Sequence, residues 1–312
     1  MKTFHGLEHF NTQGKTIITI GTFDGVHIGH QKVIKKLLKS AAKKDRPSVL
    51  LSFFPHPRMV LQKERGIKLL NTIEEREELL AKTGIENLVI LPFNREFSRL
   101  TALDFVREIL VNTLDVSRLL IGYDHQFGKN REGNFEQLTE YGHTYGFKVD
   151  KIAALDIDSI SISSTKIRKA LETGNIQTAN TYLGYEYMLS GTVVKGHNLG
   201  EKIGYPTANL HIKEDYKLIP KTGAYISKSF LNGQWVYGMT NIGYRPTVDG
   251  KSQTIETHFF NFDDNLYGRE IRIHLIDYLR DEQKFESVEH LKKQLLDDKK
   301  TALEMITSIS NK

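Results

Sequence analysis

A short apolar stretch runs directly into a turn that contains glycine and histidine, TIITIGTFDGVHIGH, from Thr16 to His30. An apolar run of this length is typical of a buried strand in a parallel sheet, and the pattern after it is helical from Gly29 to Lys44. A strand, a tight turn and a helix start in this order aim free backbone N–H groups at one point, where the helix dipole favours an anion. The stretch therefore predicts the first strand and helix of an α/β domain, with a phosphate bound between them.

The glycines and histidines of this turn have separate roles in the predicted site. Glycine permits close approach of the backbone to a phosphate. His27 and His30 are three residues apart at the helix start, so both can face the phosphates, and donors placed where charge develops stabilise a phosphoryl-type transition state without a covalent intermediate. A tight turn with two surface histidines is the alternative interpretation. The predicted nucleotide-binding residues of the turn are Gly21, Phe23, Asp24, Gly25 and Gly29.

The alternation of short apolar runs with helical patterns continues to about Leu183. A capping-box sequence from Thr72 to Glu75 opens a helix that Gly84 can close. Strands that alternate with helices indicate a parallel sheet with helices on both faces, a doubly wound Rossmann-like fold. Further strands are expected at residues 49–54, 88–91, 119–121 and 147–149, and further helices near 101–111, near 134–145 and from Ser164.

The pattern changes after about Tyr185 to an alternation of period two, which indicates antiparallel strands. Asn232-Gly233 lies between two such strands and is the strongest short hairpin signal. Strands joined in this way close into a small barrel, and the apolar positions beyond Ser287 mark a C-terminal helix or helix pair. The expected strands are 192–194, 224–231, 234–239, 254–262 and 270–279. The expected domains are an α/β domain, 1–185, and an antiparallel β-barrel domain with a C-terminal helix, 186–312.

Composition excludes several classes of protein. The chain has 312 residues and no cysteine, which removes disulfide scaffolds, thiolate metal sites and cysteine nucleophiles, and favours a reducing compartment. The first residues lack the apolar core of a signal peptide, and no run approaches the roughly 18 apolar residues of a membrane span. We expect a cytoplasmic protein with no membrane partner. The sequence leaves its oligomeric state open.

The net charge is mildly basic, +5 from 43 Lys and Arg against 38 Asp and Glu. A dedicated nucleic-acid binder would cluster its basic residues among aromatic ones. A solvated helix face explains the longest basic run, which recurs at helical spacing opposite apolar residues. We therefore expect no nucleic-acid partner. The run consists of Lys35, Lys36, Lys39, Lys43 and Lys44.

Two further kinds of segment lie where ligands bind in a parallel sheet, at helix starts and at strand ends. The segment ISSTKIR, residues 162–168, offers Ser164, Thr165 and Arg168 to a second phosphate, although an N-cap followed by an exposed arginine explains them equally. Phe54 and Phe127 belong to segments at the ends of predicted strands and can stack on a planar ligand. Core packing is an equal alternative for each phenylalanine.

Taken in order, GTFDGVHIGH, SFFPHP and ISSTKIR resemble the adenylyltransferase half of the bacterial bifunctional riboflavin kinase/FAD synthetase family, over residues 15–183. The resemblance implies a nucleotidyltransferase domain in which His27 and His30 assist attack of the FMN phosphate on the α-phosphorus of ATP. It also implies that Ser164, Thr165 and the catalytic Arg168 hold the departing pyrophosphate.

The same resemblance implies where the flavin of FMN lies. Phe54, Asp124 and Phe127 match the flavin contacts of the family. His125-Gln126 departs from the family pattern, which has an aromatic and a basic residue there. The details of the flavin pocket around these two residues therefore stay open.

A second glycine-containing segment, GTVVKGHNLGEKIGYPTANL, runs from Gly191 to Leu210. Its predicted nucleotide-binding positions are Gly196, Gly200 and Gly204. They can let the backbone wrap phosphates, although the segment lacks the Gly-Lys-Ser/Thr ending of a P-loop. Glycines alone are weak support for a nucleotide site, so this prediction depends on the residues that follow.

Three polar side chains add chemistry to this segment. Thr207 and Asn209 are two apart, so on a strand their oxygens face one side, as hard ligands for Mg²⁺. The alternative is an ordinary polar face of the barrel. Glu256 lies in a predicted strand between apolar neighbours, where its carboxylate can accept a proton from an attacking hydroxyl. The alternative there is an exposed strand glutamate.

GYPTAN, NIGYRPT and ETHFFNFDDNLYG together resemble the riboflavin kinase module, over residues 186 to about 306. The resemblance implies that Thr207 and Asn209 hold Mg-ATP and that Glu256 is the catalytic base. Tyr205 stands where the family more commonly has phenylalanine.

The two resemblances in this order predict one enzyme that phosphorylates riboflavin to FMN with MgATP and then adenylylates FMN to FAD, releasing pyrophosphate. Mg²⁺ is the expected cofactor, and the expected partners are its small-molecule substrates and products, ATP, riboflavin, FMN and FAD. There are three alternative interpretations: an FMN adenylyltransferase with that single activity, a relative of class I aminoacyl-tRNA synthetases, and a flavin- or RNA-binding protein without catalysis. The second lacks the Lys-Met-Ser-Lys-Ser-like loop and RNA-binding extension that it needs. The third disagrees with the intact set of predicted catalytic residues.

Overall fold

The computed structural model describes residues 1–12, 14–61, 67–122, 126–129, 132–152, 162–196, 200, 203–247 and 250–310. Its contacts divide the chain into two compact units, Met1–Ser164 and Thr165–Lys312, and each has its own architecture. The domain boundary that the sequence predicts, after Tyr185, stays a prediction. None of the described helices is both long and apolar enough to cross a lipid bilayer.

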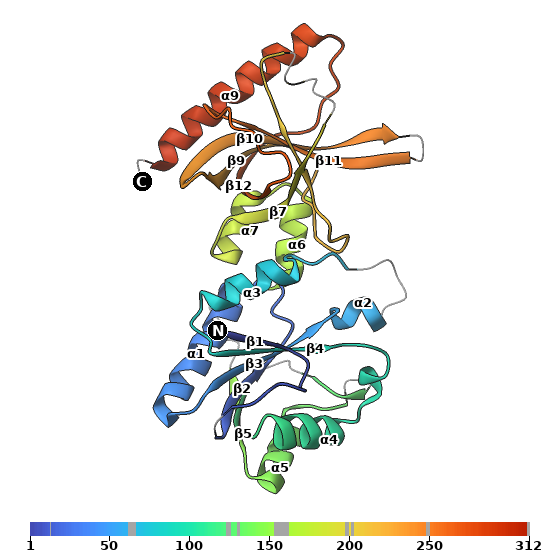
Figure 1. Cartoon of the computed structure of the whole chain (residues 1–312). Coiled ribbons are helices and arrows are strands. Elements are labelled where there is room, and N and C mark those ends of the chain that lie inside the picture. The colour runs from blue at the N-terminus through green and yellow to red at the C-terminus, as the bar shows by residue number, and fades with distance from the viewer. Residues whose placement is uncertain are drawn as a thin grey trace. The chain divides into compact units, whose positions relative to one another are not determined.

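The first unit is built on a six-stranded parallel sheet (Figure 1), which confirms the predicted doubly wound fold. The strands stand in the order β1 (Lys2–His5), β4 (Asn87–Pro92), β3 (Ser48–Phe54), β2 (Thr16–Ile20), β5 (Val116–Gly122) and β6 (Lys148–Ile152). The chain order reverses at β2, which has β3 on one side and β5 on the other. Such a switch point opens a crevice at the carboxyl ends of the strands. The turn after β2, which carries the predicted phosphate site, therefore begins at this crevice.

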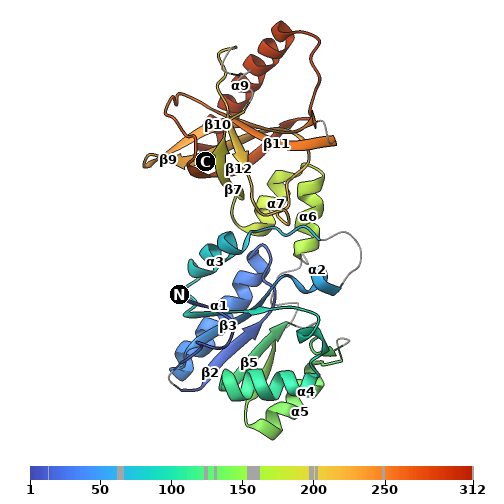
Figure 2. The same ribbon diagram turned by 45° about the vertical axis from the view of Figure 1, so that its right-hand side comes forward.

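Helices cover both faces of this sheet (Figure 2). They are, in chain order, α1 (Ile28–Lys44), α2 (Pro57–Leu61), α3 (Ile73–Ala81), the 3₁₀-helix η1 (Phe97–Arg99), α4 (Ala102–Asp104), the π-helix η2 (Phe105–Thr113) and α5 (Phe135–Tyr145). On one face, Leu37 of α1 and Leu80 of α3 belong to the same core cluster as Leu50. On the other face, η2 and α5 pack with Leu51. Consecutive residues of β3 therefore enter opposite cores, as the pleat of a strand requires.

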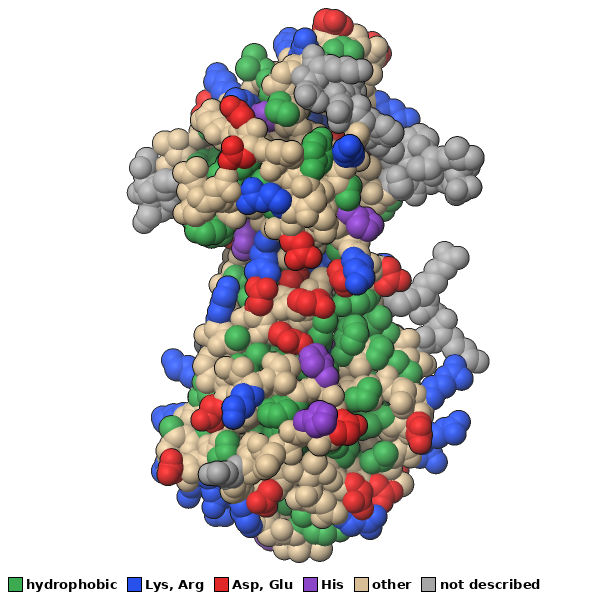
Figure 3. Space-filling model, in the orientation of Figure 1, with side chains coloured by type: hydrophobic (Ala, Val, Ile, Leu, Met, Phe, Trp, Pro, Cys, Tyr) green, Lys and Arg blue, Asp and Glu red, His purple; other side chains and the backbone are tan. Residues whose placement is uncertain are grey.

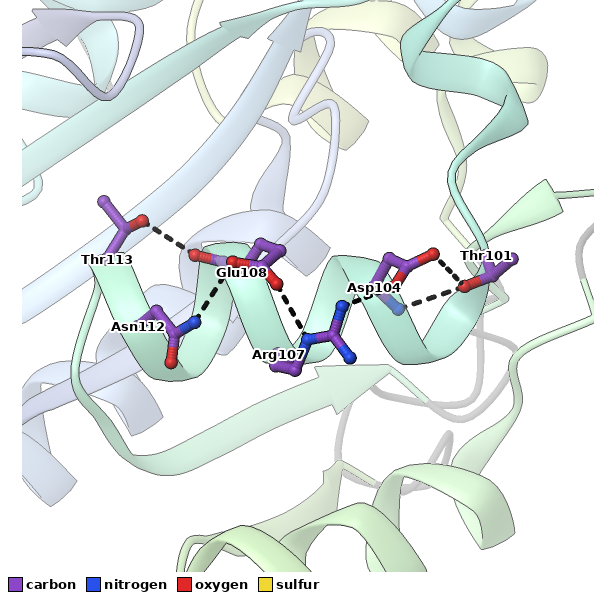
Figure 4. Close-up of polar contacts among 6 residues, drawn as sticks. All are labelled: Thr101, Asp104, Arg107, Glu108, Asn112 and Thr113. Atoms are coloured by element: carbon purple, nitrogen blue, oxygen red, sulfur yellow. Dashed lines mark hydrogen bonds and ion pairs between the residues drawn. The ribbon is translucent and has the colours of Figure 1, made fainter.

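A network of polar contacts runs along the outer face of α4 and η2 (Figure 4). Thr101 accepts a hydrogen bond from the N–H of Asp104 at 3.1 Å and so caps the helix start. Arg107 contacts Asp104 at 3.0 Å and Glu108 at 2.7 Å. Exposed ion pairs of this kind contribute little to stability, so we assign the network to a solvated helix face. On the face of this unit seen in the lower part of Figure 3, basic side chains are likewise interspersed with acidic ones.

The second unit contains a closed six-stranded antiparallel barrel, as the sequence predicts. Its strands are β7 (Tyr187–Val194), β8 (Ala208–His211), β9 (Gly223–Leu231), β10 (Gln234–Thr247), β11 (Gly250–Phe259) and β12 (Glu270–Arg280), closed in the order β10-β11-β8-β7-β12-β9. Asn232 and Gly233 join β9 to β10 with φ of +49° and +84°, as the tight turn of a two-residue hairpin requires. The C-terminal helix α9 (Val288–Ser310) is continuous and packs Ala302 against the barrel.

Two helices precede the barrel, α6 (Ser164–Glu172) and α7 (Ile176–Leu183), of which the sequence predicts only the first as a separate element. Side-chain hydrogen bonds fasten α7 to the barrel. Asn180 donates to the carbonyl of Leu275 at 2.9 Å and accepts from the N–H of Tyr187 at 2.7 Å. Gln177 donates to the carboxylate of Asp277 at 2.6 Å. These bonds explain why α7 belongs with the barrel although it precedes the change in sequence pattern.

Candidate active sites

The turn after β2 has a backbone held in a sparsely populated conformation. Phe23, Gly25 and Val26 have φ of +49°, +88° and +35°, in the left-handed region that only glycine adopts freely. Phe23 and Val26 keep it because both side chains are buried in the core that α1 covers. Gly21 lies against the ring of Phe23, and Gly29 is buried in α1. Packing therefore fixes the turn in one shape, which suits a ligand-binding role.

His27 and His30 lie together at the start of α1. The Nδ1 atom of His27 accepts a hydrogen bond from the N–H of His30 at 3.3 Å. A ring nitrogen that accepts carries no proton in that bond, so Nε2 is the nitrogen of His27 that can donate to a ligand. The two rings stack, with centroids 3.6 Å apart and 17° between their planes. The first turn of α1 has no acidic side chain, so no carboxylate opposes an anion there.

His30 is kept neutral by its surroundings. Burial lowers the pKa of His30 well below its ordinary value, and the neighbouring side chains of His27 and Arg76 lower it further. Its Nδ1 atom is buried and has no hydrogen-bond partner among the residues that the structure describes. A neutral imidazole has a single N–H, so His30 can offer one donor to a ligand at pH 7.

The free energy of unfolding is expected to fall as the pH drops below about 6.5, the ordinary pKa of a histidine. Folding lowers the pKa of His30, so below that pH the unfolded chain binds a proton that the folded chain does not. The stabilisation that is fully present above about pH 6.5 is therefore lost on acidification. Urea unfolding at about pH 7.5 and 5.5 measures the effect. His30→Gln should lose less stability between the two conditions than the native chain, and an equal loss would contradict the assignment.

Arg76 of α3 is a residue of this site that the sequence analysis missed. Its side chain is buried, and its Nη1 donates to the carbonyl of Thr22 at 2.7 Å, within the turn. Its Nη2 reaches the carbonyl of Phe53 at 3.5 Å, near the end of β3. The guanidinium therefore joins the turn to the neighbouring strand. The signal that could have found it is its helical spacing from the buried Leu80, four residues on.

A hydrogen bond links the second predicted phosphate motif to the first. The hydroxyl of Ser164 donates to the carbonyl of Asp24 at 2.8 Å. The carboxylate of Asp24 is buried and accepts from the N–H of Leu70 at 2.9 Å. Asp24 thus ties the turn to two other segments of the first unit. Thr165 and Arg168 lie in α6, within the second unit, and their contact with pyrophosphate stays a prediction.

The predicted flavin contacts have different surroundings. Phe54 is half-buried at the end of β3, whereas Phe127 is buried in the core, 5.7 Å from Phe105 between ring centroids. Asp124 and His125 lie outside the described residues. Three half-buried rings also form a cluster, with centroids 5.5 to 5.9 Å apart. They are Phe53 in β3, Phe93 just after β4 and Phe97 in η1.

The barrel carries a pocket of about 250 Å³, and Gly200, Thr207 and Glu256 are the predicted kinase residues that line it. Glu256 on β11 stands directly opposite Asn209 on β8 and opposite Asn241 on β10. Directly opposed residues of neighbouring strands present their side chains to the same face. Asn209, Glu256 and Asn241 therefore form one row across three strands. The sequence motif NIGYRPT contains Asn241, but only the register reveals its place beside Glu256.

The three predicted glycines of this site stand where a larger residue would either collide with a neighbour or strain the backbone. A Cβ at Gly196 would overlap the side-chain amide of Asn209, and one at Gly200 would overlap the carbonyl of Tyr205. Gly204 has φ of +85°, which favours glycine. The N–H of Tyr205 donates to the carbonyl of Gly200 at 2.8 Å. Gly196 therefore lies close to Asn209, and Gly200 lies close to the residues that precede Thr207.

The side-chain oxygens of Thr207 and Asn209 fit a magnesium ion that is bound together with a nucleotide. Both side chains offer neutral oxygens, and the amide nitrogen of Asn209 is 3.4 Å from the carbonyl of Thr207, which orients the amide. Among the described residues, no group of three or more His, Cys, Asp or Glu side chains could hold a metal by itself. Mg²⁺ commonly takes one or two protein ligands and completes its shell with water and substrate phosphates.

His258 lines the same pocket and is half-buried. Its Nδ1 atom is 2.9 Å from the carbonyl of Pro206. Burial lowers the pKa of His258, an effect that the hydrogen bond to Pro206 opposes and the positive charge of Lys299 reinforces. The pocket therefore has a neutral imidazole near Glu256 at pH 7.

A bidentate ion pair fastens α9 beside the pocket. The guanidinium of Arg280 donates to both carboxylate oxygens of Asp298, at 2.9 Å and 2.8 Å, and Gln294 donates to the same carboxylate at 2.8 Å. Asp298 is buried. Arg280 and Asp298 line the pocket together with Phe285 and Leu295. The sequence gives no local signal for it, because the two partners are 18 residues apart.

Asp298→Ala is expected to lower the free energy of unfolding by about 3 kcal/mol, because it leaves the partly buried Arg280 without its carboxylate. Chemical denaturation compared with the native chain measures the loss. The neighbouring Asp297 is exposed on the same helix, so Asp297→Ala is a matched control with little expected effect. Equal stability of the two variants would contradict the role of the ion pair.

Comparison with known proteins agrees with this architecture. Residues 9–166 match the FAD synthetase family, and residues 183–306 match the riboflavin kinase family. A bifunctional riboflavin kinase/FMN adenylyltransferase of Listeria monocytogenes is 39% identical over 284 residues, which cover 90% of each chain. A protein of the same description from Escherichia coli is 35% identical over 307 residues, which cover 97% of each chain.

A solved structure has the same fold over nearly the whole chain. It is a protein of Streptococcus pneumoniae described as a macrolide-efflux protein, with a TM-score of 0.87 and 30% identity. The match covers 96% of this chain and 98% of that one. With a FAD synthetase half followed by a riboflavin kinase half, and near full-length relatives that combine both, the chain belongs to the bifunctional riboflavin kinase/FMN adenylyltransferase family.

Proposed function

We propose that the two activities of this family, phosphorylation of riboflavin to FMN and adenylylation of FMN to FAD, are performed at the two sites described above. The observation that carries the proposal is that two separate sets of polar side chains lie in different compact units. The stacked histidines belong to the first unit, and the row around Glu256 belongs to the second. The absence of cysteine from the chain supports a cytoplasmic location for both reactions.

In the kinase site, Glu256 accepts the proton of the terminal hydroxyl of riboflavin as that oxygen attacks the γ-phosphorus of ATP. The bond between the γ-phosphorus and the bridging oxygen breaks, and ADP leaves. Thr207 and Asn209 are the residues that would hold Mg²⁺, which neutralises phosphate charge when it is bound. The glycines at positions 196, 200 and 204 support this assignment, because glycine lets the backbone lie close to phosphates.

In the adenylyltransferase site, a phosphate oxygen of FMN attacks the α-phosphorus of ATP, and pyrophosphate leaves. The FMN phosphate is already ionised, so this step needs no general base. His27 and His30 each donate from Nε2 to the α-phosphate oxygens, where charge develops in the transition state. Ser164, Thr165 and Arg168 are proposed to hold the pyrophosphate. The nucleotide lies on the turn formed by Gly21, Phe23, Asp24, Gly25 and Gly29.

The flavin of FMN is proposed to lie against Phe54, Asp124 and Phe127. The crevice at the switch point of the sheet supports this placement, because ligands of doubly wound sheets bind there. Arg76 is added to the site as the residue that fixes the turn.

Incubation of the full chain with riboflavin and MgATP, followed by chromatography of the flavins, tests the proposal. FMN and FAD are both expected. FAD formed only from supplied FMN would leave a single adenylyltransferase activity. Flavin binding without either product would leave the non-catalytic alternative.

A further inference from the structure

His258 lies two residues beyond Glu256 on β11, so both side chains stand on the same face of the strand. Its imidazole bonds to the carbonyl of Pro206 at 2.9 Å, within the loop that precedes β8. The ring of Tyr205 meets it edge to face, with centroids 5.0 Å apart. One side chain of β11 thus contacts two consecutive residues of that loop, next to Thr207.

This contact begins where the backbone pairing between β8 and β11 ends. The pairing consists of Glu256 with Asn209 and Thr257 with Ala208. Proline has no N–H, so Pro206 cannot donate to a neighbouring strand and can only accept through its carbonyl. The imidazole of His258 supplies that donor. A side chain therefore extends the attachment of this segment to β11 beyond the last backbone pair.

Thr207 is consequently held from both sides. Ala208, after it, is paired with Thr257, and Pro206, before it, is bound by His258. Both anchors are on the strand that carries Glu256. The position of the Thr207 backbone relative to the Glu256 backbone is therefore set by two attachments rather than one.

We propose that His258 is a positioning residue for phosphoryl transfer, which holds the carbonyl of Pro206 and thereby fixes Thr207 relative to Glu256. The inference rests on the proposed kinase function of the barrel. A carbonyl only accepts, so Nδ1 of His258 carries the proton of this bond. His258 needs no contact with the substrate for this role, because it acts through the Pro206–Thr207 segment.

Two substitutions separate positioning from packing. His258→Leu removes the N–H donor and puts an apolar side chain in its place. His258→Asn keeps an N–H donor close to the position of Nδ1. Loss of one hydrogen bond is expected to raise the KM for MgATP and the Kd for MgADP about tenfold in the Leu variant. In the Asn variant, both the KM for MgATP and the Kd for MgADP should be close to the native values. Kinetics and calorimetry on the full chain give these values, and conversion of supplied FMN to FAD should be unchanged in all variants.

His211 provides a matched control, because it is an exposed histidine on β8 of the same barrel, and His211→Leu should leave every value unchanged.

Native values of the KM for MgATP and the Kd for MgADP in His258→Leu would overturn the inference. If the Leu variant does not fold, nitrogen NMR of the native chain decides, since a His258 ring without a proton on Nδ1 would also overturn it. Failure of the native chain to form FMN would overturn the proposed function and this inference together, whereas a normal native rate with unaffected variants would overturn the inference alone.

Discussion

Glu256→Gln is expected to lower the rate of riboflavin phosphorylation by about two to four orders of magnitude. The hydroxyl of riboflavin is a poor nucleophile while it keeps its proton, and a glutamine amide cannot accept that proton. The substitution preserves the size of the side chain and its place in the row between Asn209 and Asn241. Steady-state formation of FMN measures the effect on kcat.

The affinity for MgADP should stay nearly unchanged in this variant, because Thr207 and Asn209 are proposed to hold the metal. Conversion of supplied FMN to FAD should also be normal. Glu270 is an exposed strand carboxylate of the same barrel, so Glu270→Gln is the matched control and should keep the native rate. Phosphorylation by Glu256→Gln at a rate close to native would show that Glu256 is an ordinary strand carboxylate.

His30→Ala should lower the rate of FAD formation about 100-fold while FMN formation continues. The substitution removes one N–H donor from the start of α1, at the place where charge develops on the α-phosphate. It also removes the ring on which His27 stacks, so the remaining donor is less well held. The rate of FAD formation from supplied FMN and ATP is the quantity to measure.

His143 is an exposed histidine on a helix of the same unit, and His143→Ala should leave FAD formation unchanged. A circular-dichroism spectrum of each variant reports whether the fold is kept. If His30→Ala loses the spectrum and both activities together, His30 is a structural residue and its proposed role is wrong.

The fold could be predicted where the signals are local. β2 is wholly buried and reads as one apolar run, and the hairpin at Asn232-Gly233 needs only two residues to be recognised. β1 was missed because it is a strand of four residues at the sheet edge, with exposed ends and no apolar run. The helix α7 was missed as a separate element because hydrogen bonds to the distant β12 help to hold it.

The residues of the candidate sites, too, could be predicted from the sequence only where the signals are local. The histidines of the turn and the glycines of the barrel loop stand in contiguous motifs, so the sequence places each near its neighbours. Arg76 and Asn241 could not be found like this, because a guanidinium reaching a carbonyl 54 residues away and a strand register are products of tertiary packing. The attachment of Pro206 to His258, 52 residues away, is of the same kind.

The row of Asn209, Glu256 and Asn241 also makes the kinase site sensitive to errors of strand alignment. Thr257, next to Glu256, is fully buried and shares a hydrogen bond of 2.7 Å with Thr240. A slip of β11 by one residue would exchange the two side chains and bring a carboxylate into this buried position, where an unpaired charge is strongly disfavoured. A barrel that loses the alignment of its active site therefore loses its stability as well. A misaligned barrel that is stable but inactive is not expected to accumulate.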